Sequence, residues 1–162
     1  MEYQTKIKDI DKAREMIRFL KSEGKKIVFT NGCFDIIHPG HVRYLYEAKR
    51  MGDFLIVAIN SDNSIKRIKG RKRPIMEEKA RAEIIASLGC VDIVLIFDED
   101  TPENLINTLI PDVLVKGADW REEEIAGASI VRRAGGKVAT IPYIQGYSTS
   151  SIIEKIIHRF CR

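Results

Sequence analysis

KIVFTNGCFDIIHPGH, residues 26–41, joins an apolar run to the beginning of a helical pattern. Residues 27–30 predict a buried strand, and residues 42–51 carry apolar side chains at helical spacing. Between them, His38 and His41 lie three positions apart, with a Pro-Gly turn in the middle. The N-terminus of a helix presents unpaired backbone N–H groups and the positive end of the helix dipole, and both attract phosphate. We therefore expect a strand, a loop and a helix that place two imidazoles at an anion-binding position.

The alternation of strand and helix patterns continues along the chain. Further strands are expected at residues 54–59, 91–97, 113–115 and 137–141, with helical patterns between them. Such alternation indicates βαβ units and a parallel sheet. The sequence therefore predicts a single Rossmann-like doubly wound α/β domain with a five-stranded, mainly parallel sheet. In sheets of this kind ligands bind beyond the carboxyl ends of the strands.

Some helix ends and buried faces are also predicted. Thr101 is expected to cap a helix that has Pro102 at its first position, and Ser151 with Glu154 fits a capping box. Apolar spacing predicts the stripes of two helices, namely Leu105, Ile106, Leu109 and Ile110, and then Ile152, Ile153, Ile156, Ile157 and Phe160.

Composition is typical of one soluble globular domain: 162 residues, 44% hydrophobic and 31% charged. No apolar run approaches the roughly 20 residues that span a bilayer, and the N-terminus does not read as a signal peptide. We expect a cytoplasmic protein with no membrane partner. The basic stretch 66–73 lacks the interleaved aromatic residues that stack on bases, so it favours phosphate over nucleic acid. The net charge of +4 permits anionic small-molecule substrates.

The three cysteines, Cys33, Cys90 and Cys161, have no metal-like spacing. Their scattered positions predict reduced thiols, without a disulfide or a structural metal. A zinc site at the two histidines is the alternative interpretation. Because zinc takes about four ligands and Cys33 is the only soft neighbour, a phosphate site is favoured.

The string Phe34-Asp35-x-x-His38-x-Gly40-His41 resembles the signature of the nucleotidyltransferase superfamily. This resemblance implies that His38 and His41 bind the nucleotide phosphates and stabilise the transferring one. It implies that the backbone near Cys33 and Phe34 holds the α-phosphate, and that Asp35 and Gly40 belong to the nucleotide site. Residues 25–162 would be the catalytic core, and residues 1–24 a helical extension.

The resemblance implies roles for residues in four further segments. Lys69, in the basic stretch, is expected to grip polyphosphate as a mobile point charge. Arg81 either contacts phosphate or supports the loop with a buried stem. In the nucleoside pocket we expect Lys116, Gly117 and Asp119, and at the start of the last helix Ser148, Thr149 and Ser150. Hydroxyl and N–H groups at a helix N-terminus bind phosphate readily, although capping alone is the alternative role for the serines.

Within the superfamily, the chain is most similar to the adenylyltransferases of ADP-heptose synthesis. The strings TNGCFD, NSD, KGR and LVKGADW carry this similarity, and residues 142–144 lack the arginine that is usual in cytidylyltransferases. The implied reaction is ATP plus D-glycero-β-D-manno-heptose 1-phosphate giving ADP-heptose and pyrophosphate. Mg²⁺ would be held by the ATP phosphates and not by the protein, and a homodimer is expected. The alternatives are CTP with glycerol 3-phosphate, ATP with FMN, or a non-catalytic nucleotide-binding module.

Overall fold

The computed structural model describes residues 2–118, 121, 124–142 and 146–161. Its centre is a sheet of five parallel strands in the order β3-β2-β1-β4-β5. The strands are β1 (Ile27–Gly32), β2 (Phe54–Asn60), β3 (Ile93–Phe97), β4 (Val113–Gly117) and β5 (Lys137–Ile141). The predicted doubly wound α/β fold is confirmed. The strand order changes direction at β1, so a crevice for ligands is expected where β1 and β4 end.

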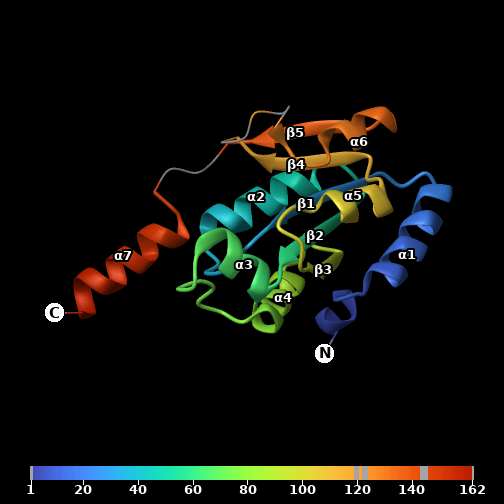
Figure 1. Ribbon diagram of the computed structural model, residues 1–162. Helices are drawn as coiled ribbons and strands as arrows, with labels where there is room; N and C mark the ends of the chain where they lie inside the picture. The colour runs from blue at the N-terminus through green and yellow to red at the C-terminus, as the bar shows by residue number, and fades with distance from the viewer. Residues whose placement is uncertain (1, 119–120, 122–123, 143–145, 162) are drawn as a thin grey trace.

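Helices cover both faces of the sheet (Figure 1). One face is packed by α2 (Pro39–Lys49) and α4 (Glu78–Ser87), and the other by α1 (Ile10–Ser22), α5 (Glu103–Leu109) and α6 (Ala128–Arg133). The remaining helices are the 3-10 helix η1 (Glu2–Lys6), α3 (Asp62–Lys69) and α7 (Thr149–Phe160). Residues 55–59 of β2 have no exposed surface. Two covered faces explain why β2 appears in the sequence as one continuous apolar run.

The N-terminal segment packs against the rest of the domain. Ile7 forms a parallel bridge with Val94 of the edge strand β3, and the Lys8 amide donates to the Val94 carbonyl at 3.0 Å. Ala13 and Ile17 of α1 are buried in the core on one face of the sheet. The first helix therefore contributes apolar surface to the sheet that carries the site. No helix among the described residues is long and apolar enough to cross a membrane.

Two predictions about helix α5 are wrong. Pro102, not Thr101, is the N-cap residue, and no side chain caps this helix. Ile110 is not a core residue, because the helix ends at Leu109 and Ile110 takes a left-handed conformation with φ of 44°. Its side chain is 39% exposed. The turn before Pro111 therefore directs Ile110 out of the stripe that Leu105, Ile106 and Leu109 bury.

Helix α7 also differs from its prediction. Its capping box pairs Ser148 with Ser151, so the expected pairing of Ser151 with Glu154 is wrong. The reason is that the helix begins three residues earlier than expected, at Thr149. The apolar stripe is present but no residue of the helix is fully buried, and Phe160 is 79% exposed. In Figure 1 the helix extends away from the sheet.

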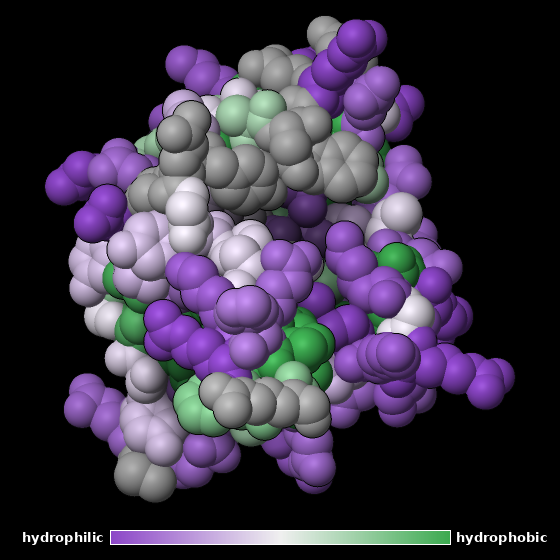
Figure 2. All heavy atoms as spheres, turned by 90° about the vertical axis from the view of Figure 1, so that its left-hand side faces the viewer, coloured by the Kyte–Doolittle hydropathy of each residue, from purple (hydrophilic) through white to green (hydrophobic). Residues whose placement is uncertain are grey.

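The carboxyl ends of the strands lie on the left of Figure 1, and Figure 2 views the molecule from that side. Hydrophilic side chains cover most of this face, which is hollowed near its centre. The loop between β1 and α2, helix α3, and the start of α7 are all found at this edge. It is therefore the edge on which the candidate site is assembled.

Candidate active site

The loop between β1 and α2 places the two histidines in contact. His38 is the N-cap residue of α2, and Pro39 is the first helical residue. The Nδ1 atom of His38 accepts a hydrogen bond from the His41 amide at 3.3 Å. The two imidazoles stack with 3.8 Å between their centroids and 18° between their planes. Because Nδ1 of His38 is an acceptor here, its neutral ring carries the proton on Nε2. Both histidines therefore stand at the start of a helix, as predicted.

Burial lowers the pKa of both imidazoles. For His41, burial and then the neighbouring His38 lower the pKa from 6.5 to about 4. For His38, burial again lowers the pKa. The ligand-free pair is therefore neutral near pH 7, since two stacked cations would repel each other. Two neutral rings can still donate N–H groups to phosphoryl oxygens, and an arriving anion would raise both pKa values.

Gly40 is required by the packing around the histidines. A Cβ atom at this position would lie 2.9 Å from the Nδ1 atom of His38 and 3.4 Å from the Cβ atom of Tyr147. The Tyr147 ring is stacked on the His38 ring at 6.4 Å, with 22° between the planes. Glycine at position 40 therefore lets the start of α2, the His38 ring and the segment before α7 approach one another.

Asp35 lies in the same loop and points inward. Asp35 as a whole residue is 1% exposed. It accepts hydrogen bonds from the Arg73 Nε atom at 2.6 Å and from the amides of Ile75 and Met76 at 2.9 Å. Burial raises the pKa of Asp35, but the two amides and Arg73 lower it more, so the net shift is downward. We expected Asp35 to bind nucleotide, whereas the structure shows its oxygens occupied by the segment before α4.

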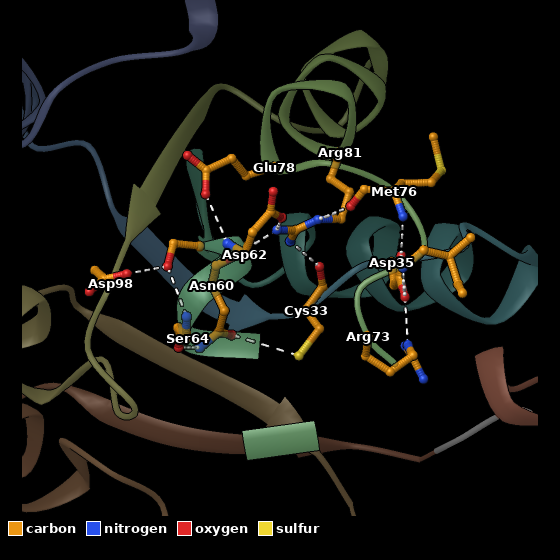
Figure 3. A network of polar contacts seen from close by, with 12 residues as sticks. Cys33, Asp35, Asn60, Asp62, Ser64, Arg73, Met76, Glu78, Arg81 and Asp98 are labelled. Atoms are coloured by element: carbon orange, nitrogen blue, oxygen red, sulfur yellow. Dashed lines mark hydrogen bonds and ion pairs between the residues drawn. The ribbon is translucent and has the colours of Figure 1, made fainter. Parts of the chain in front are cut away.

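Arg81 of α4 is fully buried. Its Nε atom donates to the Met76 carbonyl and its Nη1 atom to the Cys33 carbonyl, at 2.9 and 2.7 Å. Its Nη2 atom donates to the Asn60 carbonyl and to the Asp62 carboxylate, both at 2.8 Å. Figure 3 shows these contacts around the guanidinium group. Of the two roles considered for Arg81, the geometry supports the one in which it holds loops together.

Four basic side chains influence the pKa of Cys33. Burial raises the pKa of its thiol, and the charges of Lys69, Arg81, Arg73 and Lys116 lower it by smaller amounts. Four cations from three different segments therefore act on one position of the β1–α2 loop. The Sγ atom of Cys33 lies 4.0 Å from Oδ1 of Asn60. The thiol is protonated at neutral pH, which agrees with the expectation that its side chain does no chemistry.

Lys69 is the last residue of α3, and Gly70 ends that helix with φ of 89°. We expected these residues in a loop, but the basic stretch begins within the helix. Its members differ in their contacts. Arg67 pairs with Asp98 and Asp100, whereas Lys69 is exposed and forms no ion pair with any described residue. Lys69 is therefore available to a ligand, and Arg67 is structural.

Lys116 and Gly117 end strand β4, next to β1. The Lys116 Nζ atom donates to the Asn31 carbonyl at 3.2 Å, which ties the ends of the two strands together. Gly117 is buried. Asp119, which we expected in the nucleoside pocket, lies outside the described residues.

Tyr147, whose ring stacks on His38, directly precedes the serine-rich start of α7. Ser148 is the N-cap residue, and its Oγ atom accepts from the Ser151 amide at 3.0 Å. Thr149 is the first residue of the helix, and Ser150 is exposed. The capping role is therefore filled by Ser148, which leaves the hydroxyl groups of Thr149 and Ser150 for a ligand.

Sequence reasoning missed three residues of the site: Asn60, Arg73 and Tyr147. Asn60 ends β2 and donates to the Ser64 hydroxyl at 3.0 Å, within the polar network of Figure 3. Tyr147 stands directly before the serine-rich segment, which was a usable signal. Asn60 belongs to the NSD string and Arg73 to the basic stretch, but their partners, Ser64 and Asp35, were not deducible from spacing.

The stacked histidine pair at the start of α2 lies beyond the carboxyl ends of parallel strands, where sheets of this kind bind their ligands. The cytidylyltransferase-like family model matches residues 29–155, which include every residue of the candidate site described above. The chain belongs to this family, and it is a nucleotidyltransferase.

Two groups of known proteins are similar to this chain over most of its length, one by sequence and one by structure. The bifunctional protein HldE of Syntrophotalea carbinolica is 48% identical over 160 residues, which are 99% of this chain and 33% of that protein. The chain thus spans about a third of the length of the curated relatives it matches. A lipopolysaccharide core biosynthesis protein from Thermoplasma volcanium has a TM-score of 0.62 and 31% identity, over 77% of this chain and 100% of that chain.

A more distant structure supports the fold alone. Pantoate-beta-alanine ligase from Francisella tularensis, complexed with beta-gamma ATP and beta-alanine, has a TM-score of 0.57 at 15% identity. The match covers 94% of this chain and 77% of that chain. It agrees with the Rossmann-like arrangement of the five parallel strands.

Proposed function

We propose that the chain is an adenylyltransferase that transfers AMP from ATP to D-glycero-β-D-manno-heptose 1-phosphate, giving ADP-heptose and pyrophosphate. Relatives named HldE share about half of its residues over nearly its whole length. The structural neighbour from Thermoplasma volcanium is described as a lipopolysaccharide core biosynthesis protein. The observation that carries the proposal is the stacked pair of His38 and His41 at the start of α2, in a loop whose residue Cys33 is influenced by four basic side chains.

The proposed chemistry needs no protein nucleophile. A phosphate oxygen of the sugar phosphate attacks the α-phosphorus of ATP, and a new O–P bond forms as the bond to the β-phosphate breaks. Pyrophosphate leaves with the electron pair of that bond. Catalysis then consists of positioning and of stabilising the charge that develops on the transferring group.

Each part of the site has a proposed role in that step. His38 and His41 donate N–H groups to the phosphoryl oxygens, and Lys69 follows the polyphosphate as pyrophosphate leaves. Backbone amides near Cys33 and Phe34 bind the α-phosphate. We assign Lys116, Gly117 and Asp119 to binding of the nucleoside, and Thr149 and Ser150, on the first turn of α7, to the phosphates.

Mg²⁺ fits this site only as a companion of ATP. The acidic side chains beside the histidine loop are already paired, Asp35 with Arg73 and Asp62 with Arg81. No group of three His, Cys, Asp or Glu side chains within the described part of the chain is placed to hold a metal ion. We therefore assign Mg²⁺ to the ATP phosphates, whose negative charge it would partly neutralise. A cytoplasmic homodimer that binds no nucleic acid completes the proposal.

Pyrophosphate release tests the reaction. ATP and CTP are each to be combined with heptose 1-phosphate, glycerol 3-phosphate and FMN, with His41→Ala as the inactive control. Fastest release from ATP with heptose 1-phosphate is expected. If CTP with glycerol 3-phosphate is the best pair, both the base and the acceptor are wrong. If ATP works best with another acceptor, only the acceptor is wrong, and no release from any pair would indicate a binding module.

A further inference from the structure

We propose that Asp35 and Arg81 are positioning residues that hold the basic segment, residues 66–73, beside the histidine loop without touching either substrate. Both are buried charged side chains that the reaction proposed above does not use directly. The anchoring itself does not depend on which substrates the enzyme takes. Only the kinetic part of the inference rests on the proposed function.

Asp35 grips the end of the basic segment. Its carboxylate receives one side-chain donor, Arg73, and two backbone donors, Ile75 and Met76. The Arg73–Asp35 ion pair is short, at 2.6 Å, and the two side chains are 18% and 0% exposed. A buried carboxylate with three donors is costly to expose or to leave unpaired. The contact therefore fixes the end of the basic segment next to Asp35. Asp35 itself lies three residues before His38 in the histidine loop.

Arg81 also joins the histidine loop to the end of the basic segment. It donates to the Cys33 carbonyl, two residues before Asp35, and to the Met76 carbonyl, which follows the basic segment. It also donates to the Asn60 carbonyl and the Asp62 carboxylate, at the end of β2 and the first turn of α3. One guanidinium group thus joins the start of α3, the end of the basic segment and the histidine loop.

Ion pairs hold the basic segment near its start and at its end, and the side chains between them are exposed. At its start, Arg67 of α3 pairs with Asp98 and Asp100. Residues 69–72 are exposed, and none of Lys66, Lys69, Arg71 or Lys72 has an ion-pair partner among the described residues. Like charges in so short a stretch repel one another. Without the anchors at 73–76, the segment would leave the edge of the sheet until an anion drew it back.

Trypsin tests the anchoring without any substrate, because it cleaves after lysine and arginine. Asp35→Asn keeps the size of the side chain and removes its charge. Asp112→Asn is the matched control, since Asp112 accepts from the Ile27 amide at 2.8 Å and pairs with Lys21 at the opposite edge of the sheet. Cleavage sites are mapped by mass spectrometry well below the unfolding midpoint of each variant.

We expect Asp35→Asn to be cleaved within residues 66–73 at least about fivefold faster than the wild type, and Asp112→Asn to match the wild type there. Equal cleavage in all three would overturn the inference. If Asp35→Asn does not fold, Arg73→Gln removes the same ion pair and leaves the bonds from Ile75 and Met76 in place. The same increase is then expected, and its absence overturns the inference equally.

Kinetics separate positioning from simple folding support. With whichever nucleotide and acceptor the wild type turns over best, Asp35→Asn and Arg73→Gln should each lower kcat by about tenfold. The double variant should lose no more than the larger single loss, because both remove one contact. Losses that multiply would show that the two residues act separately and would overturn the inference. A wild type inactive on heptose 1-phosphate would refute the proposed function alone.

Discussion

Lowering the pH is predicted to destabilise this protein through His41. In the unfolded chain its imidazole titrates near 6.5, and in the fold burial and the adjoining His38 lower the pKa to about 4. Between these two values the unfolded state binds the proton and the folded state does not. Stability contributed by His41 is therefore complete above pH 6.5 and is lost as the pH falls toward 4.

The magnitude follows from the two pKa values. At pH 5 the unfolded imidazole is almost fully protonated and the folded one is about one-tenth protonated, which costs about 2 kcal/mol of folding free energy. At pH 7.5 the same linkage is close to zero. His41→Gln keeps a polar side chain of similar size and removes the titration.

Urea unfolding of both proteins at pH 7.5 and pH 5 measures this difference. The wild type should lose about 2 kcal/mol more than His41→Gln between the two pH values. Carboxylates and His38 titrate in both proteins, so their contributions largely cancel. A difference under about 0.5 kcal/mol would falsify the account of a dehydrated, neutral His41.

Three further outcomes are expected. His38→Ala should lower turnover by at least about a hundredfold, which is typical for a lost charge-stabilising donor, and should lower stability by about 1 kcal/mol because the helix cap is lost. His38→Asn should regain stability but not turnover. Near-normal turnover in either variant would remove His38 from the mechanism. Lys69→Ala should weaken ATP more than AMP in calorimetric titrations, since the proposed contact lies beyond the α-phosphate, and equal losses would place Lys69 elsewhere. Gly40→Ala should reduce kcat by about tenfold, because its Cβ atom would displace the His38 ring; unchanged kcat would show that the ring position is not critical.

The sheet was predictable because local composition determines it. Residues 54–59 form a continuous apolar run, and residues 55–59 are fully buried because helices cover both faces of the strand. The position of His38 was predictable for a similar reason, since an N-cap before Pro39 depends on adjacent residues. Both features are set within a few positions of the chain.

What sequence reasoning left open in the site depends on contacts between distant segments. Asp35 looked like a nucleotide ligand because nothing near it in sequence shows that Arg73, Ile75 and Met76 fill its oxygens. Arg81 left two roles open for the same reason, as its acceptors come from three segments, at residues 33, 60–62 and 76. Thr101 has the side chain of a helix cap, yet the helix begins one residue too late for it to cap.

The exposed stripe of α7 has a consequence for the energetics of binding. A twelve-residue helix that buries no side chain completely is marginal in water. Its amide hydrogens should therefore exchange with solvent at almost the rate of an unfolded peptide. The amide hydrogens of β2 should exchange only when the whole domain unfolds. Thr149 and Ser150 stand on the first turn of this helix, so a phosphate bound there must also order the turns behind it. Binding and helix formation are then one equilibrium, and part of the ligand's affinity is set by residues that never approach it.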